Sequence, residues 1–268
     1  MTIVRTLPLL FVCILASPAR ADDRFITLGS TTSTRDSGLL DHLLPLFKAK
    51  TGVEVHVVAV GSGQAFVLGR KGDVDVLLVH DRPAEDEFVA DGAGIERRDV
   101  MYNDFVLVGP RADPAGVHGL HDAPAALAKI AAKQSPFASR GDGSGTHQAE
   151  RRLWHAAAVE PSGTWYRETG SGMGATLNTA SGMGAYALTD RATWDTFANR
   201  GDLELLVDGD PRLRNPYSVI LVNPARQPHV KVNDARRFAD WLTSPDGQAA
   251  IGAFQRDGKP LFAPDANR

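Results

Sequence analysis

Cysteine is nearly absent from this chain, which has a single one, Cys13, among 268 residues. It lies inside a short apolar run, residues 7–16, that follows Arg5 and precedes the sequence Ala-Arg-Ala ending at Ala21. This pattern predicts an export signal peptide over residues 1–21, cleaved after Ala21, and Cys13 is too far inside the run for a lipoprotein cleavage site. We therefore expect an exported mature protein with no disulfide, thiolate metal site or cysteine nucleophile.

Long apolar runs and a strong charge of one sign are also missing. No stretch approaches the roughly 18–20 apolar residues of a transmembrane helix. The chain has 29 basic and 32 acidic residues, and removal of residues 1–21 would take two bases and no acid, leaving a formal net charge of −5. This balance gives no global attraction for nucleic acid or an anionic membrane. A bound anion would have to be held by local geometry.

The chain does show predicted strands and helices in alternation. Apolar periodicity predicts strands at 25–28, 53–60 and 74–79, and helices at 37–50, 63–70 and 83–90. It then predicts strands at 105–108, 137–139, 203–207 and 217–222, and helices at 125–133, 145–158, 233–242 and 245–254. Such alternation is typical of an α/β fold with a parallel sheet.

No low-complexity linker divides the chain, so two lobes would be joined by strands that cross between them. The natural crossings are the strand at 105–108, which ends in Gly109-Pro110, and the apolar return strand at 217–222. We predict that residues 22–106 and 216–268 form lobe 1 and that residues 107–215 form lobe 2.

Four predicted strand-to-helix turns are rich in glycine and hydroxyl side chains: 30–34, 61–64, 139–147 and 170–174. Helix N-termini offer unpaired N–H groups and a partial positive charge. In open α/β sheets, ligands bind at the carboxyl ends of the strands, where such strand-to-helix turns lie. Any one turn could be only a helix cap. The four together contain Arg140 and many neutral donors, but no P-loop motif. This pattern favours a small, compact oxyanion.

A hydrolase is the second class of function to consider. The sequence has no Gly-x-Ser-x-Gly motif and no His-Glu-x-x-His motif. His147 could activate a hydroxyl, but its commoner role is to support the loop before its helix, and His80 is expected to position the loop that follows it. Arg151 and Arg152 are expected to lie on a solvated helix face.

The turns and several further segments resemble the periplasmic tungstate-binding proteins of bacterial ABC transporters, which are two-lobed type II periplasmic binding proteins. The matching segments span nearly the whole mature chain: 30–40, 60–65, 72–80, 101–110, 139–147, 172–177, 188–191 and 215–217. The family commonly has Thr where this chain has Ser30, which keeps the hydroxyl. The resemblance implies two α/β lobes, each a mostly parallel sheet flanked by helices, with the ligand in the cleft between them.

The resemblance also implies the site and its partners. The expected ligand-binding residues are Ser30, Thr31, Thr32 and Ser62 from the first lobe and Arg140, Ser144, Thr146, Ser171 and Met173 from the second. The ligand would be tungstate, with no reaction, no cofactor and no bound metal cation. The protein would act as a monomer, with the membrane permease of an ABC transporter as its partner.

Molybdate and phosphate remain alternative ligands, and Asp142 bears on the second. Phosphate keeps a proton at neutral pH and gains from a carboxylate acceptor, whereas a free carboxylate would repel tungstate. If Asp142 pairs with a base or caps a helix, tungstate remains favoured. Arg140 likewise has two possible roles, as the charged ligand of the anion or as a brace for the loop through Asp142.

Overall fold

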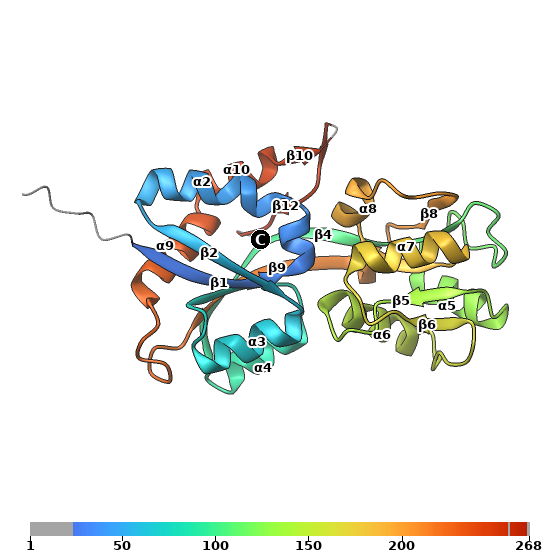
Figure 1. Cartoon of the computed structure of the whole chain (residues 1–268), viewed down its shortest axis with the longest axis horizontal. Helices are drawn as coiled ribbons and strands as arrows, with labels where there is room; N and C mark the ends of the chain where they lie inside the picture. The colour runs from blue at the N-terminus through green and yellow to red at the C-terminus, as the bar shows by residue number, and fades with distance from the viewer. Residues whose placement is uncertain (1–23, 257, 267–268) are drawn as a thin grey trace, which may run out of the picture.

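The computed structural model describes residues 24–256 and 258–266, so the expected signal peptide and Cys13 lie outside the described residues. Two lobes lie side by side, and the long strands β4 (Gly94–Pro110) and β9 (Arg214–Val222) run from one into the other (Figure 1). None of the described helices is long and apolar enough to cross a membrane. The predicted residue boundaries of the lobes stay a prediction.

The first lobe is built on three parallel strands. β1 (Phe25–Thr31) pairs with β2 (Glu54–Val60) on one side and β3 (Val76–Val79) on the other. All four residues of β3 are apolar and buried, as in a strand covered on both faces. β3 then pairs with β9 in the antiparallel sense.

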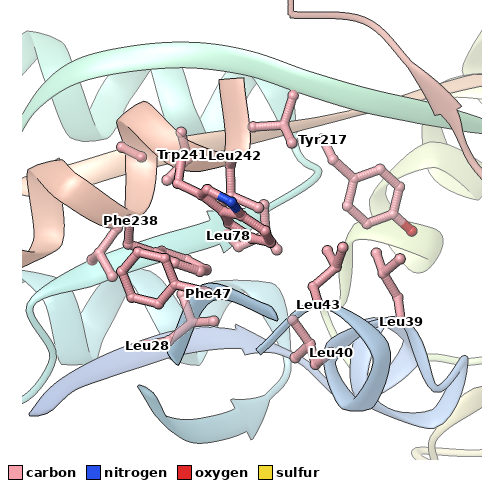
Figure 2. Close-up of a cluster of buried hydrophobic side chains, with 14 of the residues drawn as sticks. Leu28, Leu39, Leu40, Leu43, Phe47, Leu78, Tyr217, Phe238, Trp241 and Leu242 are labelled. Atoms are coloured by element: carbon pink, nitrogen blue, oxygen red, sulfur yellow. The ribbon is translucent and has the colours of Figure 1, made fainter. Parts of the chain in front are cut away.

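Helices cover this sheet on both faces: α2 (Leu39–Thr51), α3 (Ser62–Lys71), α4 (Arg82–Ala90), α9 (Val232–Thr243) and α10 (Pro245–Ala253). The helix α2 buries Leu39, Leu43 and Phe47, which are spaced four residues apart. It ends at Gly52, whose left-handed φ of 73° suits glycine. Figure 2 shows these side chains packed with Phe238 and Trp241 of α9, so the core of this lobe joins segments from both ends of the chain.

The strand β4 is much longer than predicted. Its residues 94–104 pair with β9 and residues 105–110 pair with β7 (Ala187–Asp190) and β8 (Leu203–Val207), always antiparallel. The charged run Glu96–Asp99 hid its first half from apolar periodicity. The sheets are therefore mixed, and the mostly parallel pattern expected for each lobe holds for β1, β2 and β3 but not for the strands that join the lobes.

The second lobe has its own core, centred on the buried rings of Phe137, Trp154 and Tyr186. Its strands β5 (Phe137–Ser139) and β6 (Tyr166–Glu168) are parallel. Its helices are α5 (Ala123–Ala132), α6 (Gly145–Ala156), α7 (Met173–Met183) and α8 (Arg191–Thr196), with a 3-10 turn over Pro211–Leu213. Three two-residue strands, β10 (Gln255–Arg256), β11 (Lys259–Pro260) and β12 (Ala263–Pro264), complete the chain, and β12 pairs with β4.

Candidate functional site

The N-termini of helices from both lobes meet where the lobes touch. The hydroxyl of Ser62, the first residue of α3, accepts a 3.0 Å hydrogen bond from the backbone N–H of Gly145, the first residue of α6. A Cβ at Gly145 would lie 3.0 Å from the His80 ring and 3.1 Å from Ser62 Oγ. A larger residue at this position would force these neighbours to shift by a few tenths of an ångström, so glycine suits the close contact between the lobes.

A pocket of 190 Å³ lies between the short helix α1 (Thr32–Asp36) of the first lobe and the helices α7 and α8 of the second. Its lining includes Thr32, Ser33, Met173 and Thr193. Asp36 also lines the pocket, and its exposed side chain pairs through Oδ1 with Arg35. Two predicted residues from different lobes, Thr32 and Met173, are thus brought together.

The first-lobe hydroxyls form a hydrogen-bonded group. Thr31 Oγ1 accepts from Thr34 N at 3.2 Å and caps α1, and it lies 2.7 Å from Thr34 Oγ1 and 3.1 Å from Ser33 Oγ. Ser30 behaves differently: it belongs to β1, and its buried hydroxyl donates to the Leu78 carbonyl at 2.8 Å. The Ser30 hydroxyl hydrogen is therefore used within the sheet.

His80 is buried and contacts this cluster of hydroxyls. Its Nε2 is 3.4 Å from Thr31 Oγ1 and 3.5 Å from Ser33 Oγ, and its Nδ1 is 2.9 Å from Asn215 Oδ1. Asn215 donates its own NH₂ to Asn103 Oδ1 at 2.7 Å, so its oxygen faces His80, and Nδ1 of His80 is the nitrogen that carries hydrogen. Burial, helped by the Arg140 charge, lowers the pKa of His80 to about 4, and Nε2 is an acceptor at neutral pH.

Arg140 is the buried cation of the site, with its side chain 3% exposed. Its Nε and Nη2 donate to Asp142 Oδ2 at 3.2 and 2.6 Å, and Asp142 Oδ1 accepts from Ser144 N at 3.1 Å. Partial burial would raise the pKa of Asp142, but its hydrogen bonds with Ser144 and the Arg140 charge lower it. Asp142 is therefore ionised, pairs with a base and caps the turn, while the guanidinium keeps further N–H donors.

Thr146 is one of three described residues, with Asn103 and Asp265, that have a buried side-chain polar atom without a hydrogen-bond partner. Its Oγ1 is fully buried in the first turn of α6 and has no hydrogen-bond partner among the described residues. The neighbouring Ser144 hydroxyl accepts from His147 N at 3.3 Å and caps the helix. A buried hydroxyl without a partner costs free energy, so this position points to a group that the protein atoms do not supply.

The other two predicted residues of the second lobe, Ser171 and Met173, differ in whether they face the pocket. Ser171 donates its hydroxyl to the Thr169 carbonyl at 3.0 Å, while Met173 begins α7 and is buried beside the pocket. The buried carboxylate of Asp190 accepts from Thr193 N at 2.8 Å and from Thr193 Oγ1 at 2.6 Å. Burial raises its pKa, opposed by those bonds and by the Arg140 charge. Neither Asp142 nor Asp190 has a carboxylate oxygen left without a donor.

The structure also bears on the residues considered for catalysis. His147 Nδ1 accepts from Gly143 N at 3.0 Å, which confirms its predicted role of supporting the loop. No cluster of three or more metal-ligating side chains occurs in residues 24–256 and 258–266. A wider groove of 830 Å³ runs along the outer face of α6, past His147 and Arg151, and contains none of the nine predicted site residues.

Sequence reasoning missed Ser33, Asn103 and Asn215 and gave His80 a different role, because their contribution depends on contacts between distant segments. The short run of five hydroxyl residues could have suggested Ser33. Nothing in the local sequence suggested that two asparagines on the crossing strands would orient His80.

Comparison with known proteins decides the family. Residues 16–246 match the model of the PBP superfamily domain. The tungstate-binding protein TupA of Peptoclostridium acidaminophilum is 46% identical over 245 residues, covering 90% of this chain and 86% of that protein. The chain belongs to the TupA family of periplasmic binding proteins. This family consists of substrate-binding proteins of ABC transporters, not enzymes, so the hydrolase alternative is not supported.

Solved structures agree with this family in fold. The TupA structure from Desulfovibrio alaskensis has a TM-score of 0.79 and 46% identity, covering 91% of this chain and all of that one. The structure described as the tungstate ABC transporter from Geobacter sulfurreducens has a TM-score of 0.79 and 50% identity, covering 86% and 98% of the two chains. The predicted two-lobed type II fold is confirmed.

Proposed function

We propose that this protein binds tungstate between its lobes in the periplasm and delivers it to the membrane permease of an ABC transporter. The observation that carries the proposal is the buried, unpartnered Oγ1 of Thr146, in the first turn of α6. A tetrahedral oxyanion placed against it would also be near the N-termini of α1, α3 and α7 and the Arg140 guanidinium. A dianion without protons needs donors only.

The carboxylates of the site support tungstate over phosphate. Asp142 is ionised and bonded to Arg140 and Ser144, and Asp190 is bonded to Thr193. Neither is arranged as a free acceptor for the proton that phosphate carries at neutral pH. Molybdate has the same charge and shape as tungstate, so the site offers no reason to exclude it, and the family favours tungstate.

The nine predicted residues enter this proposal with different roles. Thr31, Thr32, Arg140, Thr146 and the backbone around Ser62, Ser144 and Met173 are proposed to contact or surround the anion. The hydroxyls of Ser30 and Ser171 already donate to backbone carbonyls and would act through the backbone they hold. No cofactor and no metal cation are part of the proposal.

The test is calorimetric titration of the mature protein with tungstate, molybdate, sulfate and phosphate, paired with thermal unfolding. Tungstate at a hundredfold excess over its Kd should add about 2.7 kcal/mol to the free energy of unfolding, and sulfate should add little. Equal stabilisation by sulfate, or preferential binding of phosphate, would overturn the assignment.

Two further measurements address the partners. Light scattering of the purified chain should give the mass of a monomer. Permease and ATPase subunits reconstituted in vesicles should hydrolyse ATP faster with tungstate-loaded protein than with the ligand-free protein. Equal rates of ATP hydrolysis with the two forms would contradict delivery to the permease and leave the proposed tungstate binding untouched.

A further inference from the structure

Arg152 on α6 reaches from the second lobe to Asp81 of the first. Its Nη1 lies 3.2 Å from Asp81 Oδ1, across 71 residues of sequence. Arg152 was expected to be a solvated residue of an exposed helix face, and its side chain is indeed half exposed. Its partner, however, is only 8% exposed, so the contact is more than a pair of surface charges.

Asp81 stands at the N-cap of α4 but does not cap it. An Asp at this position ordinarily accepts a hydrogen bond from a backbone N–H of the first turn. The Asp81 side chain makes no such bond, and its backbone N–H instead donates to Glu85 Oε1 at 3.1 Å. In the described part of the chain, Arg152 is its single ion-pair partner. The carboxylate is thus directed to the other lobe at the cost of a local cap.

The pair is directly linked to the proposed oxyanion site. Asp81 follows His80, whose Nε2 contacts the first-lobe hydroxyls. Arg152 is on the same helix as Thr146 and as Gly145, whose N–H bonds to Ser62 of the first lobe. α6 therefore holds two contacts between the lobes, one at its N-terminus and one two turns later. A separation of the lobes would break both.

Because the Asp81 carboxylate is buried, the strength of its ion pair with Arg152 depends on how the two lobes are placed. Burial raises the pKa of Asp81, and the Arg152 charge opposes this effect. With the lobes together, a buried carboxylate without Arg152 would have lost its water and found no partner, which is costly. With the lobes apart, both groups would be hydrated and neither would need the other.

We propose that Asp81 and Arg152 form a cross-lobe ion pair that stabilises the ligand-holding arrangement of the lobes and so sets oxyanion affinity without touching the anion. The inference rests on the proposed function. Apparent affinity is the intrinsic affinity multiplied by the fraction of molecules in the binding-competent conformation. Loss of the pair should therefore lower the affinity for every oxyanion by the same factor.

The test is a double-mutant cycle on the full mature chain, with Kd measured for tungstate and for molybdate. Asp81→Asn and Arg152→Gln should each weaken both anions by about 3- to 10-fold, as expected for a partly exposed pair with one buried member. The double variant should be no weaker than either single variant, since each already lacks the pair. Arg151→Gln is the matched control because it removes the same charge from an exposed neighbour with no ion pair in the described residues. Its Kd should stay within twofold of wild type.

Several results would overturn the cross-lobe pair. Effects of the two single variants that multiply in the double variant would show that the residues act independently. A changed tungstate-to-molybdate ratio would mean that one of them touches the ligand. If the wild type binds tungstate and the Kd of each single variant stays within twofold of it, the cross-lobe pair is overturned and the proposed function stands. If the wild type binds none of the anions, the proposed function and the pair are both overturned. Thermal unfolding of the ligand-free variants identifies any loss of α4 stability, which would not depend on the anion.

Discussion

The Nδ1 of His80 lies 2.9 Å from the Oδ1 of Asn215, which is 135 residues further along the chain. Asn215 is on β9 and bonds to Asn103 on β4, so both strands that join the lobes are tied to this histidine. On its other side, His80 reaches the hydroxyls of Thr31 and Ser33. A buried polar network thus extends from the crossing strands to the first-lobe half of the candidate site.

This network predicts a loss of stability in acid. The folded-state pKa of His80 is lowered to about 4, mainly by burial, from an ordinary value of 6.5. Between these values the unfolded chain takes up a proton that the folded protein does not, so stability present above pH 6.5 is lost as the pH falls toward 4. We expect a contribution of about 1–3 kcal/mol to this loss.

Urea unfolding of the ligand-free protein at several pH values between 7 and 4 measures the effect. His80→Asn keeps a donor toward Asn215 and should flatten the dependence, although it lowers stability at pH 7 by leaving a cavity. His155→Asn changes an exposed histidine and is the control. An unchanged slope in His80→Asn would contradict the prediction.

A second prediction concerns Arg140. Arg140→Ala should weaken tungstate binding by about 2–5 kcal/mol, because it removes the buried cation and leaves Asp142 near the anion. Arg140→Lys should recover only part of this loss, since a lysine lacks the planar fork that can serve Asp142 and the anion together. If Arg140 only braces the loop, Arg140→Ala would lower the melting temperature of the ligand-free protein and keep tungstate affinity within threefold.

Thr146 gives a prediction in which stability and affinity change in opposite directions. Thr146→Val replaces the buried, unpartnered hydroxyl with a methyl group of similar size. The ligand-free protein should become slightly more stable, while tungstate binding should weaken by about 1–3 kcal/mol for a lost donor to a charged group. Thr146→Ser should restore binding.

The control for this prediction is Thr179→Val on α7, which removes a hydroxyl bonded to the Ala175 carbonyl. Calorimetry and thermal unfolding of the three variants give both quantities. Unchanged affinity in Thr146→Val would place the hydroxyl outside the site.

The fourth prediction concerns Glu150, a buried residue on the inner face of α6. Its Oε1 accepts from Tyr166 Oη at 2.7 Å and from Trp154 Nε1 at 3.1 Å, yet burial raises its pKa to about 7. Between pH 4.5 and 7 the unfolded chain releases this proton while the folded protein holds it, so the group lowers stability as the pH rises through this range.

Glu150→Gln should therefore be more stable than wild type at pH 8, by about 1–3 kcal/mol, and should differ less at pH 5. Unfolding by urea at the two pH values measures this difference. Glu160→Gln removes an exposed carboxylate near the same helix and should show no such pH dependence. A Glu150→Gln variant that is equally destabilised at both values would show that packing, not ionisation, dominates there.

The helices and strands were largely readable from local pattern. The spacing of Leu39, Leu43 and Phe47 and the stop at Gly52 predicted α2, and the apolar run ending at Val79 predicted β3. The first half of β4 escaped because its charged residues Glu96, Arg97 and Arg98 form ion pairs with residues of α4 and α9 instead of alternating with apolar ones. The short α1 escaped because five residues are too few for a periodic signal.

The sequence by itself determined which chemistry the candidate site could offer, since hydroxyls, glycines and one arginine at helix starts are local features. Tertiary structure decided which of these groups are free. In the folded protein the hydroxyls of Ser30 and Ser171 donate to backbone carbonyls, and Arg140 pairs with Asp142. The hydroxyl of Thr146 is left without a partner among the described residues. Tertiary structure also joined His80 to Asn215 and Arg152 to Asp81. These contacts depend on strand order and on how the lobes meet, and the burial that makes each of them matter exists only once distant segments have packed together.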